Sequence, residues 1–247
     1  MRALQAANRR KDEFLALLAH ELRSPLSAIG YAAGLLGTDA NDTGPQLPWQ
    51  ALIQRQVLRM THLVDEVLDV SRVTNGLLNL QSERVDLRVI IVNAIETLQS
   101  SIDERNQRLN SHMPGAPVWV MGDERRLEQV FVNLIANASR YTDKGGKLTT
   151  WMYVEGAEAV VRIRDSGIGI APESLPGLFE LFRQANAADP RSRAGLGVGL
   201  ALVRQLIELH GGKVTAASEG VGRGSEFTIS LPVLADWLPA KIAARAA

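Results

Sequence analysis

The sequence predicts an α+β protein in which a helical hairpin precedes a domain of helices packed on one mixed sheet. Two long segments within the first 74 residues carry apolar side chains at helical spacing. From about residue 81 onward, helices alternate with short strands, which is typical of a helix layer over a sheet. We therefore expect a hairpin over residues 1–80, an α/β sandwich over 81–235, and a tail or linker over 236–247.

The composition excludes several classes of protein. The 247 residues contain 27 Lys and Arg against 27 Asp and Glu, so the net charge is zero. With no dense basic run either, we expect no nucleic acid as a partner. There is no cysteine, which excludes disulfides and thiolate metal sites. No apolar run is long enough to span a membrane, and we expect a cytoplasmic location.

The first helix, expected over residues 1 to about 36, presents a histidine on its polar side. Leu18, Leu22 and Leu26 fall in one apolar sector of a helical projection, and His20 lies nearly opposite that sector. Glu21 is adjacent to His20, and Ser24 follows one turn later on nearly the same side. A lone exposed histidine is most often only solvated, so this pattern alone leaves its chemistry open.

The second helix is expected from Trp49 to about Thr74, after a turn-rich loop over 37–48. Its apolar positions step by four and three residues, the spacing of a coiled-coil seam: Ile53, Val57, Met60, Val64 and Val67. A hairpin gives each helix only one neighbour, so we expect two chains to form a four-helix bundle. Covering of the stripe by the second domain of the same chain is the alternative.

The α/β domain is expected to hold three main helices and two strand pairs. The expected helices span 87–103, 123–142 (capped by Asp123) and 197–209 (ended by Gly211 and Gly212), with a shorter one over 173–182. The expected strands span 118–121, 147–154 with 159–164 around a turn at 155–156, and 213–218 with 225–231.

The helix over 123–142 combines a buried stripe with a polar rim. Asn133 and Asn137 lie one turn apart, and Arg140 and Tyr141 follow on the same side. The stripe of Val130, Leu134 and Ala138 runs beside the two amides. Amides at the edge of a core need partners, which are either a structural network or a ligand.

A carboxylate ends the strand over 159–164 on the buried side. Val161, Ile163 and Asp165 point the same way along an extended chain. A buried carboxylate is costly unless it is hydrogen-bonded, and an exocyclic amine of adenine is one donor that it could accept. Gly167 and Gly169 would let the backbone approach a flat ligand closely.

A glycine-rich segment opens the helix that follows. Gly195, Gly197 and Gly199 precede Leu200 in a run that leads directly into the helix over 197–209. Free N–H groups at a helix N-terminus favour phosphate binding. The run follows a loop, not a strand, and so does not fit the dinucleotide-binding fold.

These segments together resemble a known family. The run His20-Glu21-Leu22-Arg23-Ser24-Pro25-Leu26 resembles the phosphoacceptor box of sensor histidine kinases. The segments around Asn133–Tyr141, Asp165–Gly169 and Gly195–Leu200 resemble, in order, the N, G1 and G2 boxes of the GHKL ATP-binding fold. Residues 178–182 match the F box, which ends in Phe182, and residues 222–227 match the last glycine motif. The resemblance covers residues 10–232.

The resemblance implies a role for each site residue. It implies that Asn137 ligates Mg²⁺ with support from Asn133, that Arg140 neutralises phosphate charge, and that Tyr141 stacks near the adenine. Asp165 would hold the adenine amino group, beside Gly167 and Gly169, and Gly195, Gly197 and Gly199 would bind phosphates. His20 would attack the γ-phosphate of ATP and Glu21 would accept its proton. Phe182 and Leu200 belong to the matched boxes.

The implied function is that of a two-component sensor histidine kinase, with ATP and Mg²⁺ as cofactors. The expected partners are a second copy of the chain, the receiver domain of a response regulator, and a sensor domain outside this chain. Ser24 stands where kinases with phosphatase activity usually carry Thr or Asn, so the reverse activity stays open. A GHKL ATPase-type switch and a catalytically silent dimeric scaffold are the alternatives.

Overall fold

The computed structural model describes residues 18–19, 22–35, 47–74, 78–183 and 197–234. The chain divides into two compact units, one of residues 1–77 with 194–198 and one of residues 78–193 with 199–247. His20, Glu21, Gly195 and the tail over 236–247 lie outside the described residues. None of the helices among the described residues is both long and apolar enough to span a bilayer.

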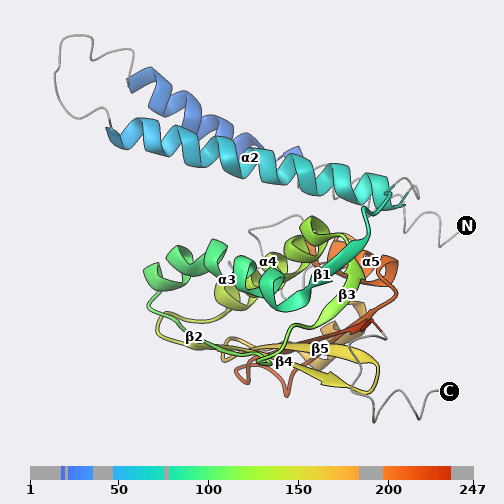
Figure 1. Ribbon diagram of the computed structural model, residues 1–247. Helices are drawn as coiled ribbons and strands as arrows, with labels where there is room; N and C mark the ends of the chain where they lie inside the picture. Colours follow the sequence, from blue (N-terminus) through green and yellow to red (C-terminus); the bar gives the residue numbers. More distant parts are fainter. Residues whose placement is uncertain (1–17, 20–21, 36–46, 75–77, 184–196, 235–247) are drawn as a thin grey trace, which may run out of the picture. The chain divides into compact units, whose positions relative to one another are not determined.

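The first unit is a helical hairpin. Residues 22–35 are helical, and α2 (Leu47–Thr74) is the second helix (Figure 1). Helix α2 begins two residues earlier than expected. Tyr31 and Trp49 pack edge to face with ring centroids 6.3 Å apart, so the two helices contact each other near the loop that joins them.

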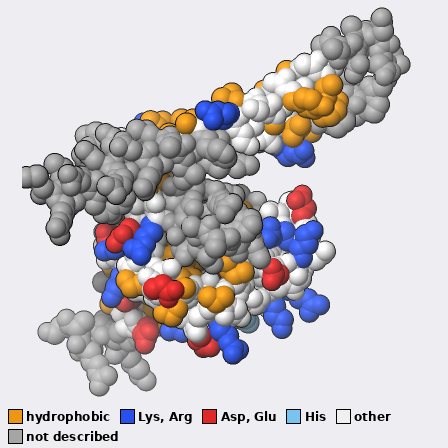
Figure 2. Space-filling model, turned by 180° about the vertical axis from the view of Figure 1, so that it is seen from behind, with side chains coloured by type: hydrophobic (Ala, Val, Ile, Leu, Met, Phe, Trp, Pro, Cys, Tyr) orange, Lys and Arg blue, Asp and Glu red, His pale blue; other side chains and the backbone are white. Residues whose placement is uncertain are grey.

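The hairpin leaves apolar side chains on its surface (Figure 2). Leu63 on α2 is buried, whereas Val57, Val64 and Leu68 remain 44–49% exposed. These three lie on one side of α2, because their spacings of seven and four residues correspond to about two turns and one turn of helix. The predicted seam is thus only partly covered within one chain.

The second unit is a layer of helices on a mixed sheet, so the predicted fold class is confirmed. Helices α3 (Leu87–Glu104), α4 (Glu124–Tyr141) and α5 (Gly199–Leu209) cover one face of a five-stranded sheet (Figure 1). The strand order is β2 (Arg108–His112), β4 (Lys147–Glu155), β5 (Glu158–Asp165), β7 (Glu226–Pro232), β6 (Lys213–Ala217). Strand β2 runs parallel to β4, and the other neighbours are antiparallel.

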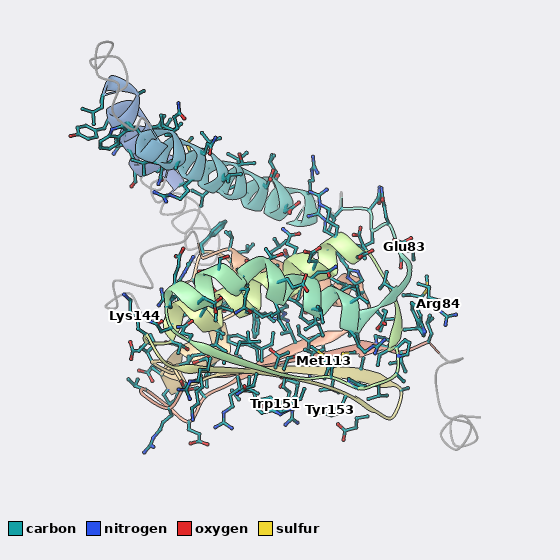
Figure 3. The ribbon with its side chains drawn as sticks, turned by 60° about the vertical axis from the view of Figure 1, so that its left-hand side comes forward. Glu83, Arg84, Met113, Lys144, Trp151 and Tyr153 are labelled. Atoms are coloured by element: carbon teal, nitrogen blue, oxygen red, sulfur yellow. The ribbon has the colours of Figure 1, made fainter. Side chains whose placement is uncertain are left out.

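Alternation along the strands separates the two faces of the sheet. On β4, Leu148, Thr150 and Met152 are buried beneath the helices. Trp151 and Tyr153 point from the opposite face (Figure 3), where Trp151 stacks on His112 and Arg162 lies over the Tyr153 ring.

Several expected elements are corrected by the structure. Strand β3 (Trp119–Gly122) pairs with an unexpected strand, β1 (Glu83–Asp86), in a separate two-stranded sheet. The unexpected strand β2 extends the main sheet. The β4–β5 turn consists of Gly156 and Ala157, since Glu155 pairs with Glu158.

The short helix expected over 173–182 is a 3₁₀ helix, η1 (Pro172–Gly177). Pro176 has no N–H to donate to the residue four positions back, and its ring clashes with that carbonyl. An α-helix therefore does not form over this segment.

Candidate functional site

Helix α4 carries the predicted amides. Its N-cap, Asp123, accepts a hydrogen bond from the backbone N–H of Arg126 at 3.1 Å, as its position before the helix predicts. Val130, Leu134 and Ala138 are at most 2% exposed, which confirms the buried stripe. Asn133, Asn137 and Tyr141 are half-buried beside that stripe, and Arg140 is exposed. The helix therefore presents a polar rim along the edge of the core.

Asp165 ends β5 as a buried carboxylate. The residue is 5% exposed, and its Oδ1 accepts hydrogen bonds from the backbone N–H groups of Gly167 (2.8 Å) and Ser225 (3.3 Å). Its Oδ2 accepts from the Ser225 hydroxyl. Burial raises the pKa of the Asp165 carboxyl, and the bonds from Ser225 and Gly167 lower it without cancelling that rise. Keeping a carboxylate there costs stability, and carboxyl groups whose pKa is raised by burial cluster at functional sites.

Gly167 and Gly169 occupy positions that a side chain could not share. A Cβ on Gly167 would lie 2.2 Å from the carbonyl oxygen of Tyr141. Gly169 has φ +68°, and its Cβ would meet the carbonyl oxygen of Gly220 at 2.1 Å. The backbone N–H of Ile168 also donates to the Tyr141 carbonyl at 3.1 Å. The loop after Asp165 is thus held directly against the end of α4.

The start of α5 lies beside the amide rim. A Cβ built on Gly199, the first residue of α5, would be 3.3 Å from the Asn133 side-chain oxygen. The N–H groups of a helix's first turn are not bonded within the helix itself, which is why a helix N-terminus favours an anion. Leu200 is half-buried in the same turn, and Gly197 just before it has φ +66°.

Phe182 lies after η1 and has φ +65°, a backbone conformation that is strained for a bulky side chain. Its neighbour Phe179 packs edge to face on Phe227 of β7, with ring centroids 6.4 Å apart. The segment that carries the predicted F box is therefore anchored on the sheet through Phe179.

On the hairpin, only Ser24 of the predicted reactive group is described, and it is exposed on the helical segment over 22–35. Within the second unit, the structure brings together three pairs of predicted site residues: Asn133 with Gly199, Tyr141 with Gly167, and Asp165 with Gly167. Among the described residues, no cluster of three or more His, Cys, Asp or Glu forms a metal site. A metal ion would have to be held by amide oxygens and by its ligand.

Ser225 was assigned no role from the sequence, yet it supplies two of the three hydrogen bonds to Asp165. The signal was its place directly after Gly222-Arg223-Gly224 and before an alternating strand. Gly224 has φ +70°, and its Cβ would lie 2.1 Å from the Asp165 carbonyl oxygen. The last glycine motif is therefore part of the Asp165 site.

Comparison with known proteins agrees with this geometry. The family model described as "Histidine kinase-, DNA gyrase B-, and HSP90-like ATPase" matches residues 122–235, and the model described as "His Kinase A (phospho-acceptor) domain" matches residues 10–76. The chain is 32% identical, over 96% of its length, to the circadian input-output histidine kinase CikA of Thermosynechococcus vestitus. It covers 33% of that relative and 31% of the CikA of Synechococcus elongatus, so it spans about a third of their length.

Solved histidine kinases share the fold. AdeS of Acinetobacter baumannii superposes with a TM-score of 0.65 at 29% identity, covering 86% of this chain and 97% of that chain. Full-length ShkA in complex with AMPPNP gives a TM-score of 0.65 at 27% identity, covering 90% of this chain and 46% of that chain. The chain therefore belongs to the sensor histidine kinases and comprises their phospho-acceptor domain followed by their ATP-binding domain.

Proposed function

We propose that this chain autophosphorylates on His20 with ATP and then passes the phosphoryl group to an aspartate of a response-regulator receiver domain. The observation that carries the nucleotide half is the Asp165 carboxylate, which is kept buried at a cost and is fixed by Ser225 and Gly167. A fixed acceptor that faces a ligand selects a donor such as the adenine amino group. The ShkA complex with AMPPNP supports a nucleotide ligand for the same domain.

We assign the remaining roles from the same arrangement. Asn137 would hold Mg²⁺ with support from Asn133, and the ion when bound would neutralise phosphate charge. Arg140 would pair with phosphate, and Tyr141 would stack near the base. These side chains lie on one rim of α4, and their proximity to the α5 N-terminus supports this assignment.

The glycines and the two matched hydrophobic residues complete the proposed site. Gly167 and Gly169 would let the backbone approach the base, while Gly195, Gly197 and Gly199 would bind phosphates. We place Phe182 and Leu200 at its border, because they flank the glycine-rich segment in the sequence.

In the proposed reaction, a ring nitrogen of His20 forms a bond to the γ-phosphorus, and the bond between that phosphorus and the β–γ bridging oxygen breaks. ADP leaves with the electron pair, and the imidazole proton passes to Glu21. Ser24 would position a water for the reverse dephosphorylation of the receiver. We place both domains in the cytoplasm, where ATP is available.

We further propose that the hairpin, over residues 1–80, dimerises as a four-helix bundle, and that residues 81–235 form the ATP-binding domain. The exposed stripe of Val57, Val64 and Leu68 supports this arrangement, because a second hairpin would cover it. The match to the phospho-acceptor model over residues 10–76 supports it as well.

The decisive experiment is incubation of the full chain with Mg²⁺ and γ-labelled ATP, compared with His20→Gln. We expect label that survives alkali and is lost in acid, as for a phosphoramidate, and no label on His20→Gln. Wild-type chain that binds ATP but takes no label would contradict the kinase assignment. Rapid release of phosphate without label would indicate an ATPase-type switch instead.

A further inference from the structure

The turn that follows α3 directs a glutamine side chain into the end of α4. Helix α3 ends in a Schellman motif, in which the N–H of Asn106 donates to the carbonyl of Asp103 and that of Gln107 to the carbonyl of Ile102. Asn106 has φ +52°, the left-handed conformation that this motif requires. Gln107 then enters the core and is only 6% exposed.

Gln107 is fully hydrogen-bonded, and all its side-chain partners lie in the last turn of α4 or directly after it. Its Nε2 donates to the carbonyl oxygens of Ser139 and Thr142, both at 2.9 Å, and lies 3.3 Å from that of Asp143. Its Oε1 accepts from the Ser139 hydroxyl at 2.6 Å. A buried amide with this many partners fixes its surroundings, because losing any partner leaves a buried polar group unpaired.

Arg105 strengthens the same attachment. Its Nη2 lies 3.2 Å from the carbonyl oxygens of both Arg140 and Thr142. The last carbonyls of a helix have no partner within the helix. Here two side chains from the α3–β2 turn bond two of them, those of Ser139 and Arg140, and also the carbonyls of Thr142 and Asp143 directly after the helix. These contacts attach the turn to the end of α4.

The last turn of α4 is also the part that holds the proposed nucleotide site together. It carries Arg140 and Tyr141, and the Tyr141 carbonyl accepts from the Ile168 N–H at 3.1 Å. Gly167 lies so close to that carbonyl that a Cβ would not fit. A shift of this turn would therefore move the Arg140 and Tyr141 side chains and the loop after Asp165 together.

We propose that Gln107 is a positioning residue for ATP: it fixes the last turn of α4 and, through that turn, both the Arg140–Tyr141 rim and the Asp165 loop. This inference rests on the proposed function. Gln107 itself touches no ligand in this arrangement. Its effect should therefore appear in nucleotide affinity and much less in the turnover number once the site is saturated.

The test uses Gln107→Glu and Ser139→Ala in the full chain. Glutamate keeps the acceptor for Ser139 but replaces the N–H donors with an oxygen that faces three carbonyls. We expect the Kd for MgATP, measured by calorimetric titration, to rise about tenfold. The autophosphorylation rate at saturating ATP should change by less than about threefold. Ser139→Ala removes only the bond to Oε1, and we expect a rise in Kd of about threefold.

Two controls separate positioning from general destabilisation. Val160→Ala shortens a buried side chain on the opposite face of the sheet, and should lower the melting temperature without changing Kd. Gln99→Ala removes an exposed glutamine whose Nε2 donates to the Asp103 carboxylate at 2.8 Å, and should change neither the melting temperature nor Kd.

Gln107→Glu and Ser139→Ala variants that bind MgATP as tightly as wild type would overturn the inference. If Gln107→Glu does not fold, Ser139→Ala alone decides. A wild-type chain that binds MgATP but is not labelled on His20 would contradict the proposed function and leave the affinity test valid. A wild-type chain that does not bind MgATP would overturn both.

Discussion

Replacing Asp165 by asparagine should weaken ATP binding while leaving the free energy of unfolding nearly unchanged. The substitution keeps the shape of the side chain and an oxygen at the Oδ1 position, which accepts from the N–H groups of Gly167 and Ser225. The new NH₂ group would replace Oδ2, and the Ser225 hydroxyl can rotate to accept from it. The internal hydrogen bonds of the site can therefore all be kept.

The expected loss lies in ligand binding. A hydrogen bond to a charged acceptor contributes about 1.5–3 kcal/mol, which corresponds to a factor of about 10–150 in affinity. We therefore expect the Kd for MgATP to rise about 100-fold in Asp165→Asn. The free energy of unfolding should stay within about 1 kcal/mol of wild type, because a costly buried charge is removed while its partners remain bonded.

The pH dependence of the stability difference between Asp165→Asn and the wild type gives an independent check. Burial raises the folded-state pKa of Asp165 above its ordinary value of 3.8, so the folded state holds this proton to higher pH than the unfolded state does. Stability of the wild type is therefore lost as pH rises from 3.8 through the raised pKa, and the loss persists at neutral pH. Asp165→Asn lacks this loss, so its stability relative to wild type should increase across the same window.

The assay is calorimetric titration with MgATP together with urea unfolding at several pH values. Asp103→Asn, an exposed carboxylate on α3, is the matched control and should change neither quantity. Unchanged ATP affinity in Asp165→Asn would refute the adenine assignment. A loss of stability of more than about 2 kcal/mol would refute the argument that the buried charge is costly to the fold.

Two further substitutions test the hairpin and the entry to the second unit. Val64→Glu should convert the expected dimer to a monomer in sedimentation experiments, because it places a charge in the apolar stripe. Arg55→Glu, on the opposite side of α2, is the control and should leave the chain dimeric. A Val64→Glu chain that is still dimeric would assign dimerisation to another surface. Asp86→Ala should lower the free energy of unfolding by about 2 kcal/mol at pH 7, because Asp86 caps α3 and accepts from the N–H groups of Arg88 and Val118. Burial raises the pKa of Asp86, but these bonds and the ion pair with Arg88 lower it below its ordinary value overall, so this contribution should be lost as pH falls through the lowered pKa. Equal free energies of unfolding for Asp86→Ala and the wild type at pH 7 would contradict this role of Asp86.

The sequence predicted best those elements whose signals are local. Helix α4 follows from Asp123 and the spacing of its apolar residues, and the structure has both the cap and the buried stripe. The end of α5 follows from Gly211 and Gly212, whose N–H groups bond the carbonyls of Glu208 and Ile207. In both cases the residues that specify the element lie within a few positions of its ends.

The two missed strands show what local signals cannot reveal. Strand β2 reads Arg-Leu-Asn-Ser-His, with one apolar residue and a mostly exposed pattern. It is a strand because its backbone pairs with β4, 39 residues further along, in parallel register. That pairing requires the turn after α3 and the end of α4 to lie next to each other. No pattern within residues 108–112 encodes this contact.

The same limit applies to the site, and it explains why glycine motifs identify a site without revealing its assembly. The sequence marks Gly167 and Gly224 as places where the backbone comes close to something. Only the structure shows that Gly167 meets the Tyr141 carbonyl and that Gly224 meets the Asp165 carbonyl. Since each contact joins two segments, a side chain at either glycine would displace the end of α4 or the end of β5. Binding at Asp165 and at the α4 rim should therefore be lost together when either glycine is substituted.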